Sequence, residues 1–523
     1  MNGMPSKFDY DQVIRNVRDA GLSNAQIRDA FVRLASRGDV EVDGTDVALT
    51  SLAYSERSIS ELLMFLLHAP NASNIPLRSD LLEGLHEQQE AAVLQACSST
   101  VSVLTGGPGT GKTHVVRRIL AAFQAAGMEV ALAAPTGKAA IRMQEMCGHP
   151  ASTIHRLLKF HPEVGFRYST RRPVERTDEG QWILGGPIPV DAIIVDEVSM
   201  VDVELMDALL AGAANGTRIV LVGDVDQLPS VGAGRVLFDI IESGVVPVTR
   251  LTHIFRQASD SPIPHLARAV NQGADLSEYL TTSGMVQMRE EQDVDDVVRA
   301  VTTLVAHTLP ASGVAPKDIQ VLCPQKGAAC GVEALNVALK AVLNDGDGVT
   351  PINIGGGYAC HVGDRVIQTA NSYTLADEER GFIGTFNGEI GTVVAGAAGG
   401  LLNVDDDVIV SAGEKTHPVV LVVDYGDRKV GYKAAEVRDL QLAYAVTGHK
   451  YQGSQSRCVV VPVHSVHQWT LTRPWLYTAI TRASERLVLV GQPEAVAAAA
   501  SNTRGTCRGT RLQVNLQMAA SNA

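Results

Sequence analysis

Residues 106–113 read GGPGTGKT, and their types and spacing suit the binding of a nucleotide phosphate. They fit the template G-x-x-x-x-G-K-[ST], the phosphate-binding loop. Its glycines let backbone N–H groups close around phosphate oxygens without a Cβ in the way. Lys112 can then reach the β- and γ-phosphates, and the hydroxyl of Thr113 can bind Mg²⁺. The candidate nucleotide-binding residues are Gly107, Pro108, Gly109, Thr110, Gly111, Lys112 and Thr113.

The segments on either side of this loop distinguish it from a glycine-rich turn that merely ends in Lys-Thr. The apolar run at 101–104 predicts a buried strand. Residues 113–127, THVVRRILAAFQAAG, carry apolar residues at helical spacing and end in glycine. The start of such a helix adds partial positive charge to the loop. Strand, loop and helix together predict a nucleotide site.

Two adjacent carboxylates, Asp196 and Glu197, follow the apolar run AIIV. Asp196 can hold Mg²⁺, and Glu197 can orient and deprotonate an attacking water. The alternative is a solvated acidic strand end. The position of the pair after a phosphate-binding loop favours the catalytic interpretation.

Three further side chains could act on the terminal phosphate. Gln227, in GDVDQLPS, can sense that phosphate or the attacking water, or it can be an ordinary turn residue. Arg256, in HIFRQ, and Arg482, in AITRA, can place a guanidinium on charge that develops during hydrolysis. A surface arginine in an ion pair explains either of them equally well from spacing alone.

The apolar runs that precede the candidate site residues predict the strands that position these residues. VSVL, VALAAP, AIIVDE and RIVLVGD alternate with helical segments, which is typical of a doubly wound parallel sheet. Each run ends at a polar cluster, and ligands of such sheets bind at the carboxyl ends of the strands. We therefore expect the four clusters to form one site.

A second series of runs, DIQVLCP, DRVIQTA, RCVVVPV and RLVLVG, predicts a second α/β domain. Two insertions interrupt the pattern. Residues 160–189 carry aromatic, arginine and Gly/Pro-turn residues, which suggests a small hairpin or protrusion. Residues 346–440 are glycine-rich and β-prone, which predicts a small β-barrel insertion.

The two ends of the chain carry no catalytic pattern. Within residues 1–80, two short amphipathic helices precede a hairpin with an Asp-Gly turn, an arrangement that resembles a winged-helix module. Such modules bind DNA or only mediate protein contacts, and the residues do not distinguish these roles. The polar tail over 499–523 is expected to be flexible.

Composition limits the class of protein. The chain has 523 residues, 45% of them hydrophobic and 19% charged, which predicts several folded domains. A net charge of −13 excludes a generally basic nucleic-acid coat but allows a local basic groove. Seven scattered cysteines without metal-ligand spacing favour a reducing compartment, and we expect a cytoplasmic protein. No apolar run approaches the length of a membrane span.

Ten ordered motifs resemble those of superfamily 1B helicases, and closely those of the RecD-like group. They span roughly residues 85–492 and read LHEQQEAAV, LTGGPGTGKT, AAPTGKAA, STIHRLL, IIVDEVSMVD, LVGDVDQLPSVGAG, LTHIFRQ, GDRVIQTANSY with FNGEIGTV, VTGHKYQGSQ, and YTAITRA.

The resemblance implies two RecA-like domains of α/β class that bind ATP and Mg²⁺ in the cleft between them. Gln89 would read the adenine, and Gln227, Arg256 and Arg482 would contact the γ-phosphate. The DNA-binding candidates are Pro135, Thr136, Lys138, Thr153, His155, Thr447, His449, Lys450, Gln452, Gly453 and Ser454. Tyr451 departs from the family, which often has a small residue there, and it could stack on a base or simply pack.

The same resemblance implies an ATP-dependent DNA helicase that moves 5′ to 3′ on single-stranded DNA, acts at junctions with duplex DNA and works as a monomer in repair or recombination. Residues 160–189 would form the pin that splits the duplex, and 346–440 an SH3-like barrel. The expected domains are an N-terminal helical, winged-helix-like domain at 1–80, a first RecA-like domain at 81–255, a second at 256–345 and 441–498, and the tail.

Two other functions stay open at this stage. One is a motor subunit of a larger recombination nuclease complex, with protein partners bound through residues 1–80 or the tail. Its nuclease would lie in another chain, because no carboxylate cluster lies outside the ATP site. The other is a nucleotide-switched binding module that does not translocate. RNA also stays open as a substrate, because phosphate contacts do not report the sugar.

Overall fold

The protein is described here by a computed structural model. The described residues are 7–9, 23–43, 46–69, 74–161, 165–170, 173–176, 182–255, 261–346, 351–372, 376–377, 381–382, 385–397, 402, 408–410, 419–504 and 508–522. The chain forms two compact units. Unit 1 contains residues 1–135, 139–258 and 503–523, and unit 2 contains residues 136–138 and 259–502.

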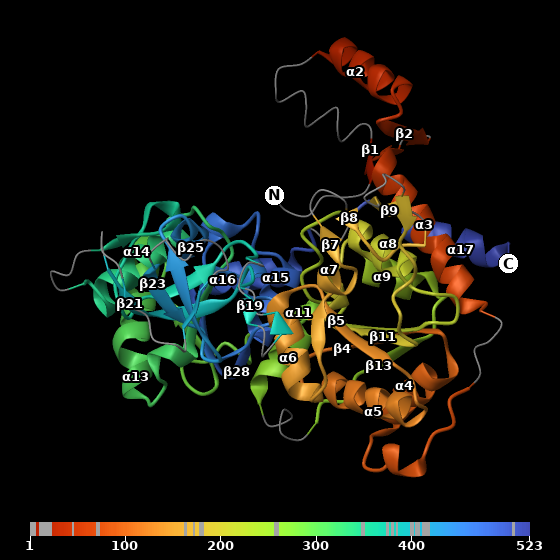
Figure 1. The fold of residues 1–523 in the computed structure, drawn as a ribbon. Coiled ribbons are helices and arrows are strands. Elements are labelled where there is room, and N and C mark those ends of the chain that lie inside the picture. The colour runs from red at the N-terminus through yellow and green to blue at the C-terminus, as the bar shows by residue number, and fades with distance from the viewer. Residues whose placement is uncertain are drawn as a thin grey trace. The chain divides into compact units, whose positions relative to one another are not determined.

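A six-stranded parallel sheet forms the centre of unit 1 (Figure 1). The four predicted runs are its strands β4, β5, β11 and β12, and the sheet also includes β6 and β13. The strand order is β13-β4-β12-β11-β5-β6, so β4 and β12, which carry the phosphate-binding loop and the GDVDQ cluster, are neighbours. The strands are β4 Val101–Gly106, β5 Val130–Ala134, β6 Ala151–Thr153, β11 Ala192–Val195, β12 Arg218–Gly223 and β13 Val248–Leu251.

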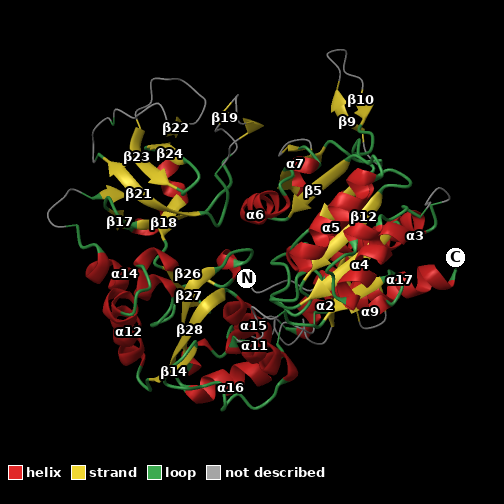
Figure 2. Ribbon diagram, turned by 90° about the horizontal axis from the view of Figure 1, so that it is seen from below, coloured by secondary structure: helices red, strands yellow, loops and turns green. Residues whose placement is uncertain are grey.

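Both faces of this sheet are covered by helices (Figure 2). Alternate strand residues belong to opposite cores. Ile193 and Val195 pack with α8, α9, α3 (Thr50–Leu67) and α17 (Leu512–Ser521), whereas Ala192 and Ile194 pack with α4 and α5. This alternation follows from the two-residue period of a strand buried on both sides. The helices are α4 Glu87–Ser98, α5 Lys112–Ala125, α6 Gly137–Cys147, α7 Ile154–Leu157, α8 Val203–Ala211 and α9 Val236–Ser243.

The described residues of the N-terminal region include a small sheet and the helices α2 and α3. Strand β1, Lys7–Asp9, pairs with the hairpin of β2, Val40–Asp43, and β3, Asp46–Leu49. The predicted second helix is α2, Asn24–Ser36, with Ser23 as a capping-box N-cap. The predicted first helix is wrong where it begins, because residues 7–9 are a strand. The remainder of that predicted helix, residues 10–21, lies outside the described part of the chain.

Helix α3, Thr50–Leu67, belongs to the core of unit 1 and not to a separate N-terminal domain. Ile59 and Leu63 are fully buried in the core that α8 and α9 also build. The predicted N-terminal domain of residues 1–80 therefore does not include this helix, which is part of the first parallel-sheet domain. Its apolar stripe needs a partner, and the parallel sheet domain supplies one.

The C-terminal residues correct a second expectation. Residues 499–523 were expected to be flexible, but helix α16, Pro493–Ser501, reaches Ser501, and helix α17, Leu512–Ser521, follows. Leu512 and Leu516 of α17 are fully buried against unit 1. The expectation of flexibility rested on the polar composition of the tail and overlooked these two leucines, which lie one helical turn apart and form a buried face.

The first insertion forms two small antiparallel pairs, in agreement with the predicted hairpin or protrusion. Strand β7, Phe160–His161, pairs with β8, Gly165–Phe166, and β9, Pro173–Arg176, pairs with β10, Trp182–Leu184. The β9–β10 hairpin projects from the remainder of unit 1 (Figure 2).

Unit 2 contains a second parallel sheet, as predicted, with five strands in the order β14-β28-β27-β15-β26. Helices α12 and α14 lie on one face and α11, α15 and α16 on the other (Figure 2). The strands are β14 Val286–Glu290, β15 Ile319–Cys323, β26 Ala445–Thr447, β27 Ser456–Val463 and β28 Ala483–Gly491; the helices are α11 Pro262–Gln272, α12 Val294–Thr303, α13 Leu309–Ala311, α14 Val332–Leu343 and α15 Arg473–Thr481.

The second insertion forms a separate, mostly antiparallel six-stranded sheet. It includes DRVIQTA, which was predicted to belong to the second α/β domain and pairs here antiparallel with β21 and β25. An apolar run of this length does not report which sheet will contain it. The strands are β18 Arg365–Gln368, β21 Ile390–Gly396, β22 Val408–Val410, β23 Val419–Asp424, β24 Lys429–Lys433 and β25 Leu440–Leu442; short pairs elsewhere are β16 Ile352–Asn353 with β17 Ala359–Cys360, and β19 Ala376–Asp377 with β20 Gly381–Phe382.

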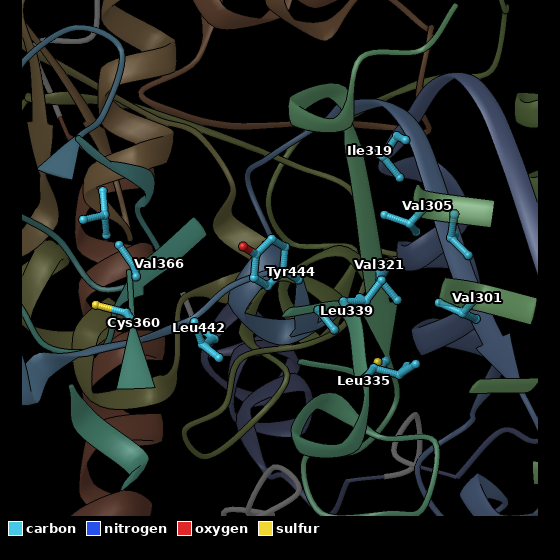
Figure 3. Packing of buried hydrophobic residues seen from close by; sticks show 14 of the residues in the cluster. Val301, Val305, Ile319, Val321, Leu335, Leu339, Cys360, Val366, Leu442 and Tyr444 are labelled. Carbon is cyan, nitrogen blue, oxygen red and sulfur yellow. The ribbon is translucent and has the colours of Figure 1, made fainter. Parts of the chain in front are cut away.

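This second sheet and the parallel sheet of unit 2 share one hydrophobic core. Figure 3 shows Tyr444 between Val321 of the parallel sheet and Val366 of the inserted sheet. The Tyr444 hydroxyl donates to the buried Asp364 carboxylate at 2.7 Å. Packing and this hydrogen bond therefore hold the insertion on unit 2.

Candidate active site

The phosphate-binding loop joins the end of β4 to the first residue of α5. Gly109 and Gly111 have φ of 74° and 80°, a left-handed conformation that favours glycine. A Cβ at Gly111 would collide with the Gln89 amide and approach the Phe255 ring to 3.3 Å. The loop therefore needs glycine for its conformation and for its close packing.

Lys112 lies over this loop. Its Nζ donates to the carbonyl oxygens of Gly106 at 2.5 Å and Gly107 at 3.1 Å. The Thr110 hydroxyl donates to the same Gly107 carbonyl at 2.9 Å. These contacts keep the ammonium beside the glycine backbone that the sequence predicted to bind phosphate.

Gln89 is buried against the loop, with 3% of its surface exposed. Its Nε2 donates to the Thr110 carbonyl at 3.3 Å, and its Oε1 accepts the His86 backbone N–H at 3.3 Å. The side chain thus ties the start of α4 to the loop.

Three aromatic rings beside Gln89 were not predicted as site residues. His86 and His253 stack with centroids 4.4 Å apart, and Phe255 meets the His253 ring edge-on at 5.0 Å. The Phe255 backbone N–H donates to the Gly109 carbonyl oxygen at 3.2 Å. A signal was present in the sequence, because these rings lie in LHEQQ and LTHIFRQ. Arg256, the next residue, lies outside the described residues.

Asp196 and Glu197 follow the end of β11, next to the loop. The Asp196 carboxylate accepts the Glu197 backbone N–H at 2.8 Å. Glu197 has φ 54° and ψ 39°, a left-handed conformation that costs a residue with a Cβ about 1–3 kcal/mol. Burial, and then the charge of Glu197, raise the pKa of Asp196 to about 6, against the opposing effects of Lys112 and Arg142.

Gln227 follows β12 and is 8% exposed. Its Nε2 donates to the Asp224 carboxylate at 3.1 Å, and the backbone N–H of Asp226 donates to the same carboxylate at 3.2 Å. Asp224 therefore orients Gln227, a role that sequence reasoning missed although both residues lie in GDVDQ. Burial, and then Asp224, raise the pKa of Asp226 to about 6.

Strand pairing brings these clusters together, because β12 pairs in parallel with both β4 and β11, so that the carboxyl ends of the three strands lie at one edge of the sheet. The Lys112 ammonium also opposes the raised pKa of Asp196 and that of Asp226. The predicted convergence of the phosphate-binding loop with the ends of β11 and β12 is therefore confirmed. The hydroxyl of Thr113 and the carboxylate of Asp196 supply oxygen ligands, which Mg²⁺ prefers. The donor set at this site fits Mg²⁺.

Arg482 is 3% exposed and follows α15 in unit 2. Its guanidinium donates to the carbonyl oxygens of Ser454 at 3.1 Å and Thr478 at 3.3 Å, and to the Thr481 hydroxyl at 3.1 Å. The arginine is therefore held rigidly within its own unit, next to the residues of VTGHKYQGSQ.

The candidate DNA-binding residues on the first parallel sheet surround β5 and β6. Pro135 follows β5, and Thr136 and Lys138 lie at the start of α6. Thr153 is 7% exposed, and its hydroxyl accepts the backbone N–H of Arg156 at 3.2 Å as the N-cap of α7. Its side chain has a structural role as a cap.

His155 is half-buried in an aromatic group at the base of the first insertion. Its ring lies 5.5 Å from the Phe160 ring and 5.7 Å from the Phe166 ring, measured between centroids. Burial lowers the pKa of His155. Phe160 is 44% exposed, so this group includes an accessible ring.

The candidates in unit 2 lie together after β26. Thr447 ends this strand and its hydroxyl accepts the Lys450 backbone N–H at 3.4 Å, while His449 begins the short 3₁₀ turn that follows. Lys450 is half-buried, and burial and Lys326 lower its pKa. Gln452 and Ser454 are 5% and 2% exposed, and Gly453 between them has φ 73°.

Tyr451 packs inside unit 2. The residue is 4% exposed, and its hydroxyl contacts the Ser456 hydroxyl at 2.5 Å and the Gln455 carbonyl at 3.3 Å. The structure therefore supports the interpretation that Tyr451 packs inside the domain, and not the interpretation that it stacks on a base.

Comparisons with known proteins agree with this site. Residues 84–291 match the AAA domain family, and residues 442–490 match the UvrD-like helicase C-terminal domain. The ATP-dependent RecD2 DNA helicase of Deinococcus radiodurans is 33% identical over 88% of this chain and 57% of its own length. The RecBCD enzyme subunit RecD of Mycolicibacterium smegmatis is 32% identical over 89% of this chain and 81% of its own length.

A solved structure is also similar, that of a Bacteroides Pif1 helicase in complex with ADP-AlF3 and ssDNA. It is 16% identical, with a TM-score of 0.48, over 84% of this chain and 97% of that chain.

The two parallel sheets and the loop site define a P-loop ATPase built from two RecA-like domains. Within that class, the chain belongs to the RecD-like group of superfamily 1B helicases. The chain spans just over half the length of the Deinococcus relative. In the part of the chain that the structure describes, no helix is long and apolar enough to cross a bilayer.

Proposed function

We propose that this chain translocates 5′ to 3′ on single-stranded DNA and unwinds duplex DNA at junctions. The observation that carries the proposal is the parallel pairing of β4, β12 and β11, which brings the phosphate-binding loop with Lys112, the Asp224–Gln227 pair and Asp196 to one edge of the sheet. ATP hydrolysis at such a site supplies the free energy for directed movement. The direction follows from the family resemblance, because no residue reports polarity.

Each residue of this site has a defined task in our proposal. Lys112 and the loop N–H groups bind the phosphates, while Thr113 and Asp196 hold Mg²⁺. When bound, Mg²⁺ neutralises phosphate charge. Glu197 accepts a proton from the attacking water, and Gln227, oriented by Asp224, positions that water or senses the terminal phosphate.

Nucleotide recognition involves further residues. Gln89 would read the adenine, and its burial beside the loop supports that role. Arg256 and Arg482 would stabilise charge on the γ-phosphate. The three hydrogen bonds that fix the Arg482 guanidinium support a positioned, pre-organised group.

DNA binding would use the phosphate-contact candidates in both units. Thr136, Lys138 and His155 would act with Thr447, His449 and Lys450, and contacts of this kind are independent of sequence. We assign the pin to the β9–β10 hairpin and the SH3-like insertion to the six-stranded sheet of unit 2. The projection of that hairpin from unit 1 supports its role as the pin (Figure 2).

An unwinding assay with the purified chain tests the proposal. Two duplexes that share one sequence carry a single-stranded tail of equal length at either the 5′ or the 3′ side. We expect ATP-dependent separation of the 5′-tailed duplex alone. Separation of only the 3′-tailed duplex would overturn the assigned polarity.

A second candidate function follows from the Mycolicibacterium relative, which is a RecBCD enzyme subunit. In that case the chain would be the motor subunit of a recombination nuclease complex. Intact ATPase stimulated by single-stranded DNA, with no unwinding by the chain alone, would favour this candidate. ATPase that single-stranded DNA does not stimulate would reject both candidates and favour a switched binding module. Stimulation by RNA in place of DNA would change the substrate.

A further inference from the structure

The C-terminal segment 508–522 packs on the first parallel-sheet domain and has no assigned role. Leu512 and Leu516 anchor it in the core beside α3 and α9. The Gln513 amide donates to the Glu242 carbonyl of α9 at 3.2 Å. The segment therefore has a defined position on this domain.

Arg508, just before this anchor, contacts the loop that follows Gln227. Its Nη1 donates to the carbonyl oxygens of Gly232 at 3.1 Å and Gly234 at 2.9 Å. Burial, and then the charge of Arg235, lower the pKa of Arg508 to about 10, so the side chain is still a cation at neutral pH. A charged donor on two backbone acceptors gives hydrogen bonds stronger than neutral ones.

The other side of this loop rests on the start of α8. The Val203 backbone N–H donates to the Ala233 carbonyl at 3.1 Å. A Cβ at Gly232 would collide with the Asp202 side chain, and one at Gly234 would collide with Val203. Loop 230–235 is therefore confined between α8 and Arg508.

Two contacts of the residues that follow Arg508 fix the backbone beside it. The Thr510 hydroxyl donates to the buried Asp239 carboxylate at 2.7 Å, and the Arg511 backbone N–H donates to the Glu56 carboxylate at 3.0 Å. Glu56 lies on α3 and Asp239 on α9. The arginine thus reaches the loop from a segment that is fixed at both α3 and α9.

We propose that Arg508 is a positioning residue for Gln227, so that the C-terminal segment is part of the hydrolytic machinery. The inference rests on the proposed role of Gln227 in hydrolysis. Gln227 lies three residues before this loop, so restraint of the loop limits how far the Gln227 backbone can move while its amide donates to Asp224. Misplacing a catalytic group lowers the rate of the chemical step, whereas nucleotide affinity depends mainly on the phosphate-binding loop, which Arg508 does not touch.

The test is steady-state ATPase at saturating single-stranded DNA for Arg508→Ala, Arg508→Lys and the control Gln513→Ala. For Arg508→Ala we expect kcat to fall roughly 10- to 100-fold with KM for ATP unchanged within about twofold. Arg508→Lys should recover part of kcat, because an ammonium can also donate to carbonyl groups. Gln513→Ala removes a docking contact of the same segment without touching the loop, and its kcat should stay within about twofold of the parent.

Gln227→Ala, alone and combined with Arg508→Ala, separates this inference from the proposed function. We expect the double variant to match Gln227→Ala within about twofold in kcat, since residues that act as a unit are not additive. An unchanged kcat in Gln227→Ala would overturn the proposed role of Gln227. A kcat loss in Arg508→Ala that multiplies fully with that of Gln227→Ala would overturn the inference alone. Equal losses in Gln513→Ala and Arg508→Ala, or a rise in KM without loss of kcat, would also overturn it.

Discussion

Single residues of the active site combine hydrogen bonding with backbone conformations that ordinary residues avoid. Lys112 donates to two carbonyl groups of its own loop, and Glu197 has a left-handed backbone although it carries a side chain. Strain of this kind persists where surrounding structure imposes it and is often found at functional sites. Both residues permit sharp tests.

Replacing Lys112 with alanine should abolish ATPase, with a loss of at least about 100-fold, because it removes the only side-chain cation of the phosphate-binding loop. Binding of single-stranded DNA, measured by fluorescence anisotropy, should persist. The exposed Lys317 supplies the matched control, and Lys317→Ala should keep parental ATPase. Equal ATPase in Lys112→Ala and the parent would show that the nucleotide site is elsewhere.

Replacing Glu197 with glycine should stabilise the fold and stop catalysis. Glycine adopts φ 54° without the steric cost that a Cβ carries, so the free energy of unfolding should rise by about 1 kcal/mol. The ATPase rate should fall at least about 100-fold with the loss of the carboxylate base. Denaturant unfolding and steady-state ATPase measure the two effects.

Glu197→Gln serves as the matched control, because it keeps the strained backbone and removes the charge. Its ATPase should fall as far as that of the glycine variant, without the gain that relief of strain provides. A glycine variant less stable than Glu197→Gln would argue against strain at this position.

At the scale of elements, the insertions and terminal helices are attached to the parallel sheets by specific contacts. The first insertion leaves and rejoins unit 1 beside one turn. The Thr170 backbone N–H donates to the Ala211 carbonyl at 2.9 Å, and the Ile188 backbone N–H donates to the Gly212 carbonyl at 2.8 Å. Because Ala211 and Gly212 are adjacent, the hairpin between these anchors can be removed without displacing the sheet.

Replacing residues 172–186 with a Gly-Ser-Gly linker tests the proposed pin. Stimulation of ATPase by single-stranded DNA should stay within about twofold of the parent, since the hairpin supplies no residue of the active site. Unwinding of the tailed duplex should fall at least about 10-fold, because nothing separates the strands ahead of the motor. Unwinding at the parental rate would reject the pin assignment.

Helix α17 should contribute to stability through its buried face. Leu516→Ala removes a fully buried side chain and should lower the free energy of unfolding by about 2–5 kcal/mol. Val514, on the same helix, is 53% exposed, and Val514→Ala should change the free energy of unfolding by less than about 0.5 kcal/mol. Denaturant unfolding of both variants provides the comparison, and equal effects would contradict docking of this helix.

For the molecule as a whole, a net charge of −13 means that DNA must be bound by local contacts against a repulsive background. Such binding depends strongly on salt, because each neutralised phosphate releases counterions. The half-buried Lys450 is a candidate for one of these phosphate contacts.

Measuring affinity for single-stranded DNA across salt concentrations tests this contact. Lys450→Ala should reduce the slope of log K against log salt by about 0.7, the value for one phosphate of a single strand. Lys317→Ala again provides the control and should leave the slope unchanged. A Lys450→Ala slope equal to that of the parent would remove Lys450 from the DNA path.

Local sequence determined the first parallel sheet and most of its site. The strand runs, the glycine loop and the carboxylates after AIIV depend on period-two burial, on backbone freedom and on position at strand ends, all of which are visible within a few residues. Convergence of the phosphate-binding loop with the clusters that contain Asp196 and Asp226 was predicted from the parallel sheet, because parallel strands present their carboxyl ends at one edge.

Tertiary packing decided what local patterns leave open. It assigned DRVIQTA to the inserted sheet, buried Tyr451, and placed α3 and α17 in the core of the first domain. Each outcome depends on partners far away in the chain, and an apolar run has the same appearance whichever surface covers it. The contact of Arg508 with the loop after Gln227 is of this kind, since the two segments are more than half the chain apart and meet only in the folded molecule.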